Sequence, residues 1–494
     1  MKYGAITIGP VFDTISQARS VSELWTASYL YSWFSQQLVA KLQAEKAVMI
    51  APKAIENVDT KSVGCYSDRL YFELGSWNGN QKEFEKIVLR IKHDLAVVII
   101  STLHMPRGFE ACKKYLDKAI YAKMAVVEQK DFNLSQLNKI LNTYETGYDF
   151  VSIESRDESD FIEQFLNRSI LWRCKFIVEA NMQKVQRIDS IASKAREIPY
   201  DKGDLTEDGA EEEFVSVDSP RIAKYYAIVY ADGDGLGTYL ENLNQSDYEK
   251  TSEELIKTSG ECAQSVRDFG GQPIYFGGDD MFFIAPVYNK EQNKHLLAFL
   301  GELRTIFHNM SKINQSNNNN KKYSIRRNKT RHQSQLKFTC ATDSDRLLRW
   351  RRRTTSLSFG VSIAYYKYPM SQVIEDARGM LFGVAKEAEW TTGKKNTIAL
   401  QLRKNSGSTI KFALSPELLE TVCLLLNCFL NQDALHSLHW KILTQFDLLF
   451  ELLYSFDCKI MGNSFEAANE RLELWFKNNF NEAVHKERLG TVKK

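Results

Sequence analysis

The first part of the chain alternates between short apolar runs and longer amphipathic segments. The run Ala5-Ile6-Thr7-Ile8 predicts a strand, which Gly9-Pro10 ends. Apolar positions then recur at helical spacing over residues 24–42. Ser20 and Glu23 stand just before them in the pattern of a capping box. The opening therefore predicts a strand, a turn and a helix.

Two further strand-like patterns, at 68–74 and 96–100, complete an α+β domain that extends over residues 1–150. The segment 155–195 has apolar positions among charged ones and predicts helix. An acidic run at 197–213 is typical of a solvated linker. We therefore expect residues 151–219 to be a helical segment with a linker.

Residues 220–402 predict a second α+β domain, in which a long insert at 312–353 separates a helix from a strand. The predicted order is strand 225–231, helix 248–268, hairpin 272–285, helix 290–309, strand 355–366, helix 371–387 and strand 396–402. After this domain, leucines recur at helical spacing. Residues 403–494 are thus predicted to form a helical bundle used for packing or subunit contact.

The hairpin carries two acids at its tip. Gly277, Gly278, Asp279 and Asp280 lie between two apolar runs, which predicts strand, tight turn and strand. Adjacent carboxylates between buried strands repel each other unless a cation joins them. Gly and Asp are also ordinary turn residues, so the alternative is a turn with no further role.

A second apolar run also ends in acid, and this favours the functional interpretation. The strand 225–231 is followed by Asp232-Gly233-Asp234-Gly235. If the two strands are neighbours, three or four carboxylates meet, a set that suits two Mg²⁺ ions and a nucleoside triphosphate. We therefore predict Asp232, Asp279 and Asp280 as catalytic metal ligands.

Other residues nearby are predicted to contact the nucleotide. Asp234 is a candidate for a second metal or for a supporting role. Glycines permit close approach of the backbone to phosphate, and the candidates are Gly233, Gly235, Gly277 and Gly278. Lysines at a predicted helix end and in the next turn are candidates for the β- and γ-phosphates, namely Lys386, Lys394 and Lys395. Gly393-Lys394-Lys395 does not satisfy the P-loop pattern.

Composition limits the possible partners. The net charge of +2 over 494 residues excludes a chain that is basic throughout. Contact with nucleic acid must come from local patches, and the insert at 312–353 is rich in Lys and Arg. A grip on RNA phosphates and a solvated surface loop are equally compatible with that insert.

Neither a secretory signal nor an apolar run long enough to cross a membrane is present, which is typical of a cytoplasmic protein. The eight cysteines include no CxxC pair, so reduced thiols and no structural zinc are expected.

Several motifs together resemble the second palm domain of the Cas10/Cmr2 family, the large subunit of type III CRISPR effector complexes. They are Asp232-Gly233-Asp234, Gly277 to Asp280, the strand from Ser358 to Ala364 followed by Tyr366 to Pro369, and the ending formed by Ala385-Lys386 and Gly393 to Asn396. The N-terminus from Ile8 to Leu30 resembles the opening of the Cmr2 first palm. The resemblance covers most of the chain.

The resemblance implies two ferredoxin-like palms related to GGDEF cyclases and polymerase palms, together with helical domains. It implies a type III-B ribonucleoprotein complex with crRNA, target RNA and other Cmr subunits, and no membrane. Target RNA would switch on conversion of ATP, with Mg²⁺ or Mn²⁺, into a signalling nucleotide. That product is a cyclic oligoadenylate in most relatives and an adenylate conjugate of S-adenosylmethionine in some short ones. Asp279 and Asp280 match the family's GGDD acids, and Asp232 matches the metal acid of the first strand.

The sequence departs from the family in three places. It opens at the first palm, where relatives often begin with an HD nuclease domain, so DNA cleavage by this subunit is not expected. The cysteine zinc site common between the palms is missing. Ser67-Asp68-Arg69 stands where the first palm would carry a catalytic hairpin, so this palm is expected to bind the acceptor nucleotide, with Asp68 as a contact. The alternatives are a stand-alone GGDEF-like cyclase and a non-catalytic RNA-binding scaffold.

Overall fold

The computed structural model describes residues 1–53, 63–146, 161–168, 225–316, 356–390 and 393–430, together with positions 474, 475 and 478. The chain divides into two units, Met1–Ser415 and Pro416–Lys494. The first unit contains a four-stranded and a six-stranded sheet with helices packed on them, which confirms the predicted α+β class. The four domains expected from the sequence stay a prediction.

The four-stranded sheet has the strand order β2-β3-β1-β4, and every neighbouring pair is antiparallel. With helices after the first and third strands, this is the ferredoxin-like βαββαβ arrangement. Its strands are β1 (Lys2–Gly9), β2 (Val48–Ala51), β3 (Arg69–Glu73) and β4 (Tyr121–Glu128). Its helices are α1 (Val11–Ser16), α2 (Val21–Ala44), α3 (Gln81–Leu103), α4 (Phe109–Ala119), α5 (Leu134–Thr146) and α6 (Phe161–Arg168), with a 3₁₀ turn η1 (Pro106–Gly108) before α4.

The six-stranded sheet repeats this topology and extends it. Its order is β14-β13-β10-β5-β7-β6, so the four strands from β10 to β6 are again arranged fourth, first, third and second. The strands are β5 (Tyr225–Asp234), β6 (Gln272–Gly277), β7 (Asp280–Pro286), β10 (Ser356–Tyr365), β13 (Ile398–Arg403) and β14 (Thr409–Leu414), and the short pairs are β8 (Tyr288–Asn289) with β9 (Lys294–His295) and β11 (Glu389–Trp390) with β12 (Gly393–Lys394). The helices are α10 (Leu236–Glu241), α11 (Gln245–Asp268), α12 (Leu296–Ser316) and α14 (Met370–Met380), with a π-helical turn η4 (Leu381–Ala385) after α14.

Two sequence-based expectations are wrong. Residues 96–100 lie within α3 and form no strand. Their side chains are buried at helical spacing against α2 and α4, which a short apolar run cannot reveal by itself. Residues 409–414 form β14 within the segment that was expected to be wholly helical, because they pair with β13. Helix α15 (Pro416–Leu430) follows, and most of the predicted bundle, like most of the insert at 312–353, lies outside the described residues.

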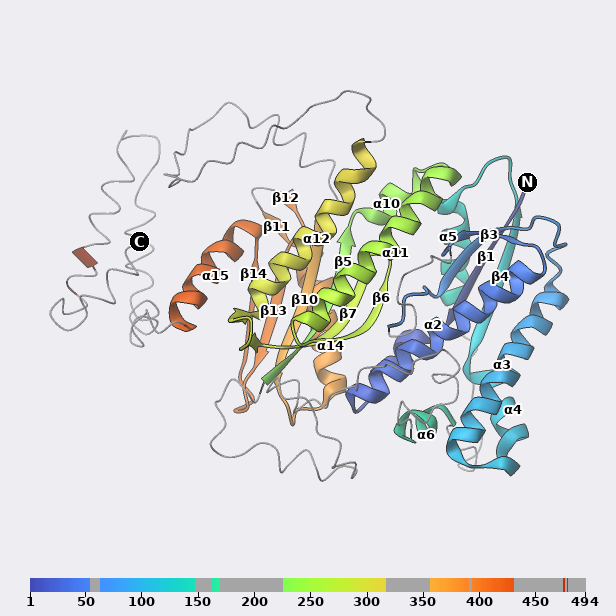
Figure 1. Ribbon diagram of the computed structural model, residues 1–494, viewed down its shortest axis with the longest axis horizontal. Helices are drawn as coiled ribbons and strands as arrows, with labels where there is room; N and C mark the ends of the chain where they lie inside the picture. The colour runs from blue at the N-terminus through green and yellow to red at the C-terminus, as the bar shows by residue number, and fades with distance from the viewer. Residues whose placement is uncertain are drawn as a thin grey trace. The chain divides into compact units, whose positions relative to one another are not determined.

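Helices cover both faces of the second sheet. Figure 1 shows α11 and α12 side by side on one face, where Phe269 and Phe299 stack with ring centroids 4.2 Å apart. Helix α14 lies on the opposite face and crosses β10 at Gly360. A Cβ on Gly360 would lie 2.2 Å from the carbonyl oxygen of Ala377, so this close approach requires glycine.

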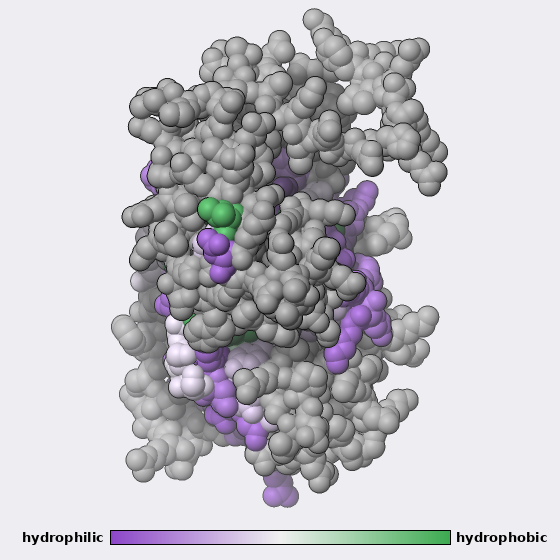
Figure 2. All heavy atoms as spheres, turned by 90° about the vertical axis from the view of Figure 1, so that its left-hand side faces the viewer, coloured by the Kyte–Doolittle hydropathy of each residue, from purple (hydrophilic) through white to green (hydrophobic). Residues whose placement is uncertain are grey.

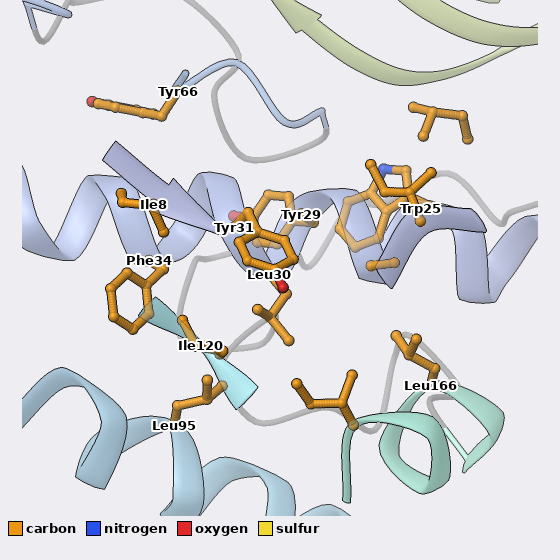
Figure 3. Packing of buried hydrophobic residues seen from close by; sticks show 14 of the residues in the cluster. Ile8, Trp25, Tyr29, Leu30, Tyr31, Phe34, Tyr66, Leu95, Ile120 and Leu166 are labelled. Atoms are coloured by element: carbon orange, nitrogen blue, oxygen red, sulfur yellow. The ribbon is translucent and has the colours of Figure 1, made fainter. Parts of the chain in front are cut away.

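Helix α2 joins the two sheets. Its apolar residues are buried in a core that reaches from β1 and α3 to β5, β6 and α14. Trp25 and Tyr29 stack within it at a centroid distance of 4.6 Å, and Figure 3 shows them above Leu30 and Ile120. Ser28 on the same helix donates a hydrogen bond to the carbonyl oxygen of Ile274 in β6, at 3.1 Å. Ser20 accepts from the Glu23 amide at 3.3 Å, so the predicted helix start is confirmed.

The surface of the described residues carries scattered apolar side chains. The face seen in Figure 2 shows mostly hydrophilic side chains among the coloured residues. In the part of the chain that the structure describes, no helix combines the length and the apolar character needed to span a bilayer.

The crossing of α14 over β10 yields a stability prediction. We expect Gly360→Ala to lower the unfolding free energy by about 1–3 kcal/mol, because the new methyl group would collide with helix backbone. Gly379→Ala on α14 is the matched control, since its Cβ would meet no atom within 4 Å. Denaturant unfolding followed by circular dichroism measures both variants, and equal stability of the two would contradict this packing argument.

Candidate functional site

The register of two antiparallel strands brings the predicted acids together. Ala231 on β5 pairs with Met281 on β7, so Asp232 and Asp280 are the next neighbours across the strands. Gly277 pairs with Asp280 to close a two-residue turn made of Gly278 and Asp279. Gly278 has φ of +74°, which glycine adopts without strain. The turn therefore holds both acids of the hairpin beside the end of β5.

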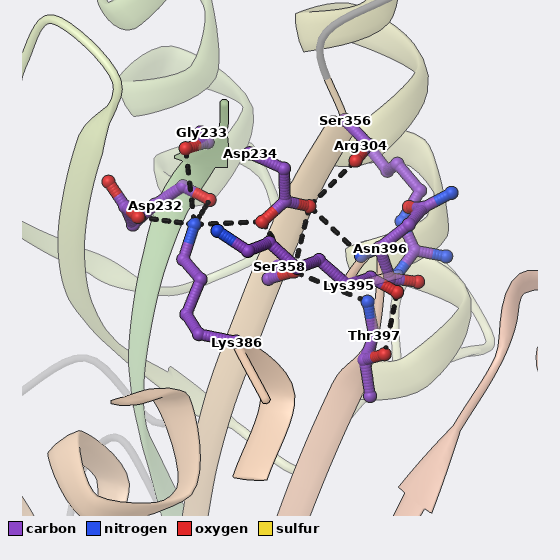
Figure 4. A network of polar contacts seen from close by, with 10 residues as sticks. All are labelled: Asp232, Gly233, Asp234, Arg304, Ser356, Ser358, Lys386, Lys395, Asn396 and Thr397. Carbon is purple, nitrogen blue, oxygen red and sulfur yellow. Dashed lines mark hydrogen bonds and ion pairs between the residues drawn. The ribbon is translucent and has the colours of Figure 1, made fainter. Parts of the chain in front are cut away.

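Asp234 is held from several sides by hydrogen bonds (Figure 4). Its carboxylate accepts from the hydroxyls of Ser356 at 2.6 Å and Ser358 at 2.8 Å, both on β10. It also accepts from the backbone amide of Asn396 at 3.0 Å. With a side chain only 7% exposed, Asp234 is the most enclosed acid at this strand end. Its place fits a positioning role better than direct contact with a metal.

The ammonium group of Lys386 lies between the two acids of β5. It forms an ion pair with Asp232 and another with the Oδ1 of Asp234 at 2.8 Å. It also donates to the carbonyl oxygens of Asp232 at 2.9 Å and Gly233 at 3.1 Å. The π-helical turn η4 places Lys386 there, because its backbone amide bonds to the Leu381 carbonyl at 2.9 Å. Burial alone would lower the pKa of Lys386, but the charges of Asp232 and Asp234 raise it.

The two hairpin acids have pKa values far from those of free aspartate. Burial raises the pKa of Asp279 to about 7, and the negative charge of Asp232 adds to the effect. Loss of solvation also raises the pKa of Asp280, with further contributions from the charges of Asp279 and Asp232, although part of this residue is exposed at the turn. Asp279 lies directly over Gly233, where a Cβ would come within 2.9 Å of the Asp279 Cβ. Such mutual repulsion is what a bound cation would relieve.

Asp68 of the first sheet belongs to the same electrostatic cluster. Its negative charge contributes to the raised pKa of Asp280 and to that of the Tyr275 hydroxyl. Burial raises the pKa of Asp68 itself, and the neighbouring Arg69 opposes that shift. The segment that precedes β3 contacts the second sheet here, because the amide of Phe276 in β6 donates a hydrogen bond to the carbonyl oxygen of Gly64 at 2.8 Å. Asp68 therefore stands within electrostatic range of the hairpin.

Most of the predicted site residues lie together, but Lys394 does not. Asp232, Asp234, Asp279, Asp280 and Lys386 surround one end of β5. The predicted glycines lie at the same strand end, and Gly235, with φ of +73°, begins α10. Lys394 is exposed and pairs with Glu389, and Lys395 forms the turn before β13.

The hydrogen bonds that hold Asp234 were not predicted from the sequence. Ser358 and Asn396 belong to motifs that carry the family resemblance, but neither was assigned a contact, and Ser356 was not singled out. One signal was available, because Ser356 and Ser358 share a strand face with a spacing of two, and that face meets the acids of β5.

The donor set suits a hard divalent cation. The side chains and backbone near the end of β5 offer oxygen atoms only, the ligands that Mg²⁺ and Mn²⁺ prefer. Within the described residues, no three His, Cys, Asp or Glu side chains stand around a common point that would hold a metal ion. The ammonium of Lys386 lies among those oxygens instead. The metal role of Asp232, Asp279 and Asp280 stays a prediction, and their chemistry fits it.

Comparisons with known proteins find two family models, one matching part of each sheet. The family model described as Cas10/Cmr2, second palm domain, matches residues 225–348. The model described as CRISPR-associated protein Cmr2, N-terminal, matches residues 3–88. No curated protein matches the chain.

Two solved structures are similar over most of the chain. A chain of the type III-B Cmr-beta cryo-EM structure in the apo state has a TM-score of 0.57 and 12% identity, covering 92% of this chain and 76% of that one. A chain of type III-B Cmr-beta bound to cognate target RNA has a TM-score of 0.50 and 13% identity, covering 92% and 77%. At these identities the likeness establishes the fold.

The raised pKa of Asp279 predicts how stability depends on pH. In the absence of divalent ions, the folded state holds this proton up to a pH of about 7, whereas the usual value for aspartate is 3.8. Stability is therefore lost as pH rises through this window, because only the unfolded state gains from ionisation. We expect Asp279→Asn to raise the melting temperature at pH 8 and to change it little at pH 4.

Melting scans at both pH values measure this effect. Asp268→Asn is the control, since Asp268 is an exposed acid at the end of α11. An equal change in melting temperature at both pH values would show that Asp279 does not carry the dependence.

Proposed function

We propose that this chain, which two Cas10/Cmr2 family models match in part, is the large subunit of a type III-B CRISPR effector complex and a nucleotidyltransferase activated by target RNA. The observation that carries the proposal is the meeting of Asp232, at the end of β5, with Asp279 and Asp280 at the β6–β7 turn. Palm-type nucleotidyl transfer requires carboxylates at this place, because the reaction joins two groups of high negative charge.

The four acids have two different tasks in the proposed reaction. Asp232, Asp279 and Asp280 would hold Mg²⁺ or Mn²⁺. When bound, the ion neutralises the triphosphate, lowers the pKa of the attacking 3′-hydroxyl and stabilises the pyrophosphate that leaves. Asp234 keeps Lys386 in place through its 2.8 Å contact.

The surroundings of the acids suit a triphosphate. Gly278 leaves the backbone of the turn open for close approach, since a Cβ there would meet no atom within 4 Å, whereas Gly233 is covered by Asp279. Lys386 is the buried cation of the site and a candidate for the β- and γ-phosphates. Lys394 and Lys395 remain candidates at the next turn, where Lys394 is free to exchange an exposed glutamate partner for phosphate.

We assign the acceptor molecule to the first palm. Asp68 approaches the site from the other sheet, and its charge acts on Asp280 and Tyr275. The acceptor is a second ATP if the product is a cyclic oligoadenylate, and S-adenosylmethionine if the product is an adenylate conjugate. In this proposal residues 1–150 form the acceptor palm and residues 220–402 the catalytic palm, with 151–219 between them and 403–494 as a helical bundle.

The proposed partners are crRNA, target RNA and other Cmr subunits, in a cytoplasmic complex. One similar chain belongs to a type III-B Cmr-beta complex that is bound to cognate target RNA. The basic insert at 312–353 is the segment of this sequence with the charge to contact RNA phosphates.

The decisive experiment is mass spectrometry of products from the assembled complex with ATP and Mg²⁺. We expect a signalling nucleotide only when matched target RNA is present. Cyclic oligoadenylate from ATP alone would identify ATP as the acceptor, and a new adduct that needs S-adenosylmethionine would identify the mixed product. Activity without RNA or partners would favour a stand-alone cyclase. If an intact complex gave no product, the chain would be a non-catalytic scaffold.

The same assay tests the acids. We expect Asp279→Ala and Asp280→Ala each to lower the rate of product formation about a hundredfold or more, because each removes a ligand of the ion that would stabilise the transition state. Asp268→Ala, at the far end of α11, should retain the full rate. Assembly of the complex is checked by size-exclusion chromatography, and full activity of the two hairpin variants would refute the assigned site.

A further inference from the structure

Lys386 is surrounded as a bound cation would be. Its ammonium contacts a carboxylate oxygen of Asp232, the carbonyl oxygens of Asp232 and Gly233, and the Oδ1 of Asp234. The side chain is only 9% exposed, so water has little part in its solvation. These four oxygens offer more acceptors than the three N–H groups of the ammonium require.

The two acids that hold Lys386 differ in how firmly they are fixed. Asp234 also accepts hydrogen bonds from Ser356, Ser358 and the Asn396 amide. These donors keep its carboxylate in place whether or not Lys386 is present. Asp232 is 23% exposed and neighbours Asp279 and Asp280, whose charges repel its own. Asp234 is therefore a fixed anchor for Lys386, and Asp232 is a partner that it can lose.

The proposed ion and Lys386 require the same oxygens. Mg²⁺ binds oxygen at about 2.0–2.1 Å and keeps a rigid octahedral shell. An ammonium group already lies within hydrogen-bonding distance of the backbone carbonyls beside Asp232. Two cations cannot share these oxygens at such distances, because both the space and the charge forbid it.

We propose that Lys386 occupies the cation position of Asp232 in the nucleotide-free chain, and that a divalent ion binds there only by displacing it. The displaced ammonium remains on Asp234 and is then available to a phosphate group. Ion and triphosphate therefore bind cooperatively. The ion displaces Lys386 from Asp232, and the phosphate gives the displaced ammonium a new partner. This inference rests on the proposed function in one respect, namely that Asp232 is an ion ligand.

The first test measures Mn²⁺ binding to the full chain, without nucleotide, by electron paramagnetic resonance. We expect Lys386→Met to bind Mn²⁺ about tenfold more tightly than the unchanged protein, a typical coupling between competing sites. Asp232→Asn should abolish this binding in both backgrounds. Lys404→Met is the control, since Lys404 is exposed beyond β13 and should leave the affinity unchanged.

The outcomes separate the two proposals. Mn²⁺ binding that depends on Asp232 but is the same with and without Lys386 overturns the displacement and leaves the ion site standing. Absence of saturable binding in every variant, including Lys386→Met, overturns the ion role of Asp232 and with it the proposed function.

A second measurement needs no variant and so does not depend on how Lys386→Met folds. Acetylation of lysine amines, followed by mass spectrometry of the unchanged protein, reports how accessible Lys386 is. We expect its acetylation rate to rise severalfold on addition of saturating Mn²⁺, while that of Lys404 stays constant. An unchanged rate at Lys386 when Mn²⁺ is bound would overturn the proposal.

Discussion

The antiparallel register between β5 and β7 determines where every charge of the site lies. It sets Asp232 beside Asp280, and the two-residue turn then fixes Asp279 over Gly233. A shift by one residue would turn these side chains to the opposite face of the sheet. The buried aromatic pair Tyr230 and Phe282, stacked at 4.1 Å, opposes such a shift one step further along the strands.

Carboxylates gathered in this way repel one another unless positive charge lies among them. Lys386, which follows α14 and its π-helical turn, supplies that charge. Helix α14 can approach β10 closely only because Gly360 has no side chain. The π-helical turn that follows directs Lys386 toward β5. π-Helical turns are rare and frequently occur at functional sites, which agrees with this placement. The packing of one helix on the sheet thus decides the electrostatics at the strand ends.

The sequence carried enough information for the acids and too little for their supports. Two apolar runs that each end in Asp could be recognised, because strand pairing leaves few ways to arrange them. The helix start at Ser20 could also be recognised, because Ser20 and Glu23 form a local capping pattern. The partners of Asp234 come from β10 and from the turn before β13, which lie more than a hundred residues further along the chain. Such long-range hydrogen bonds depend on tertiary packing, and neither propensity nor spacing encodes them. The strand expected at 96–100 failed for a related reason, since β-branched residues buried on a helix look like a strand when their partners are unknown.

The backbone contact between Gly64 and β6 links the positions of charged residues in the two sheets. It holds the segment that leads to Asp68 against the strand that leads to the hairpin. Repulsion between Asp68 and Asp280 falls with their separation, so sliding of one sheet along the other would retune the proton affinity of Asp280. The proton affinity of the hairpin therefore depends in part on the distance that the rest of the fold sets between Asp68 and Asp280.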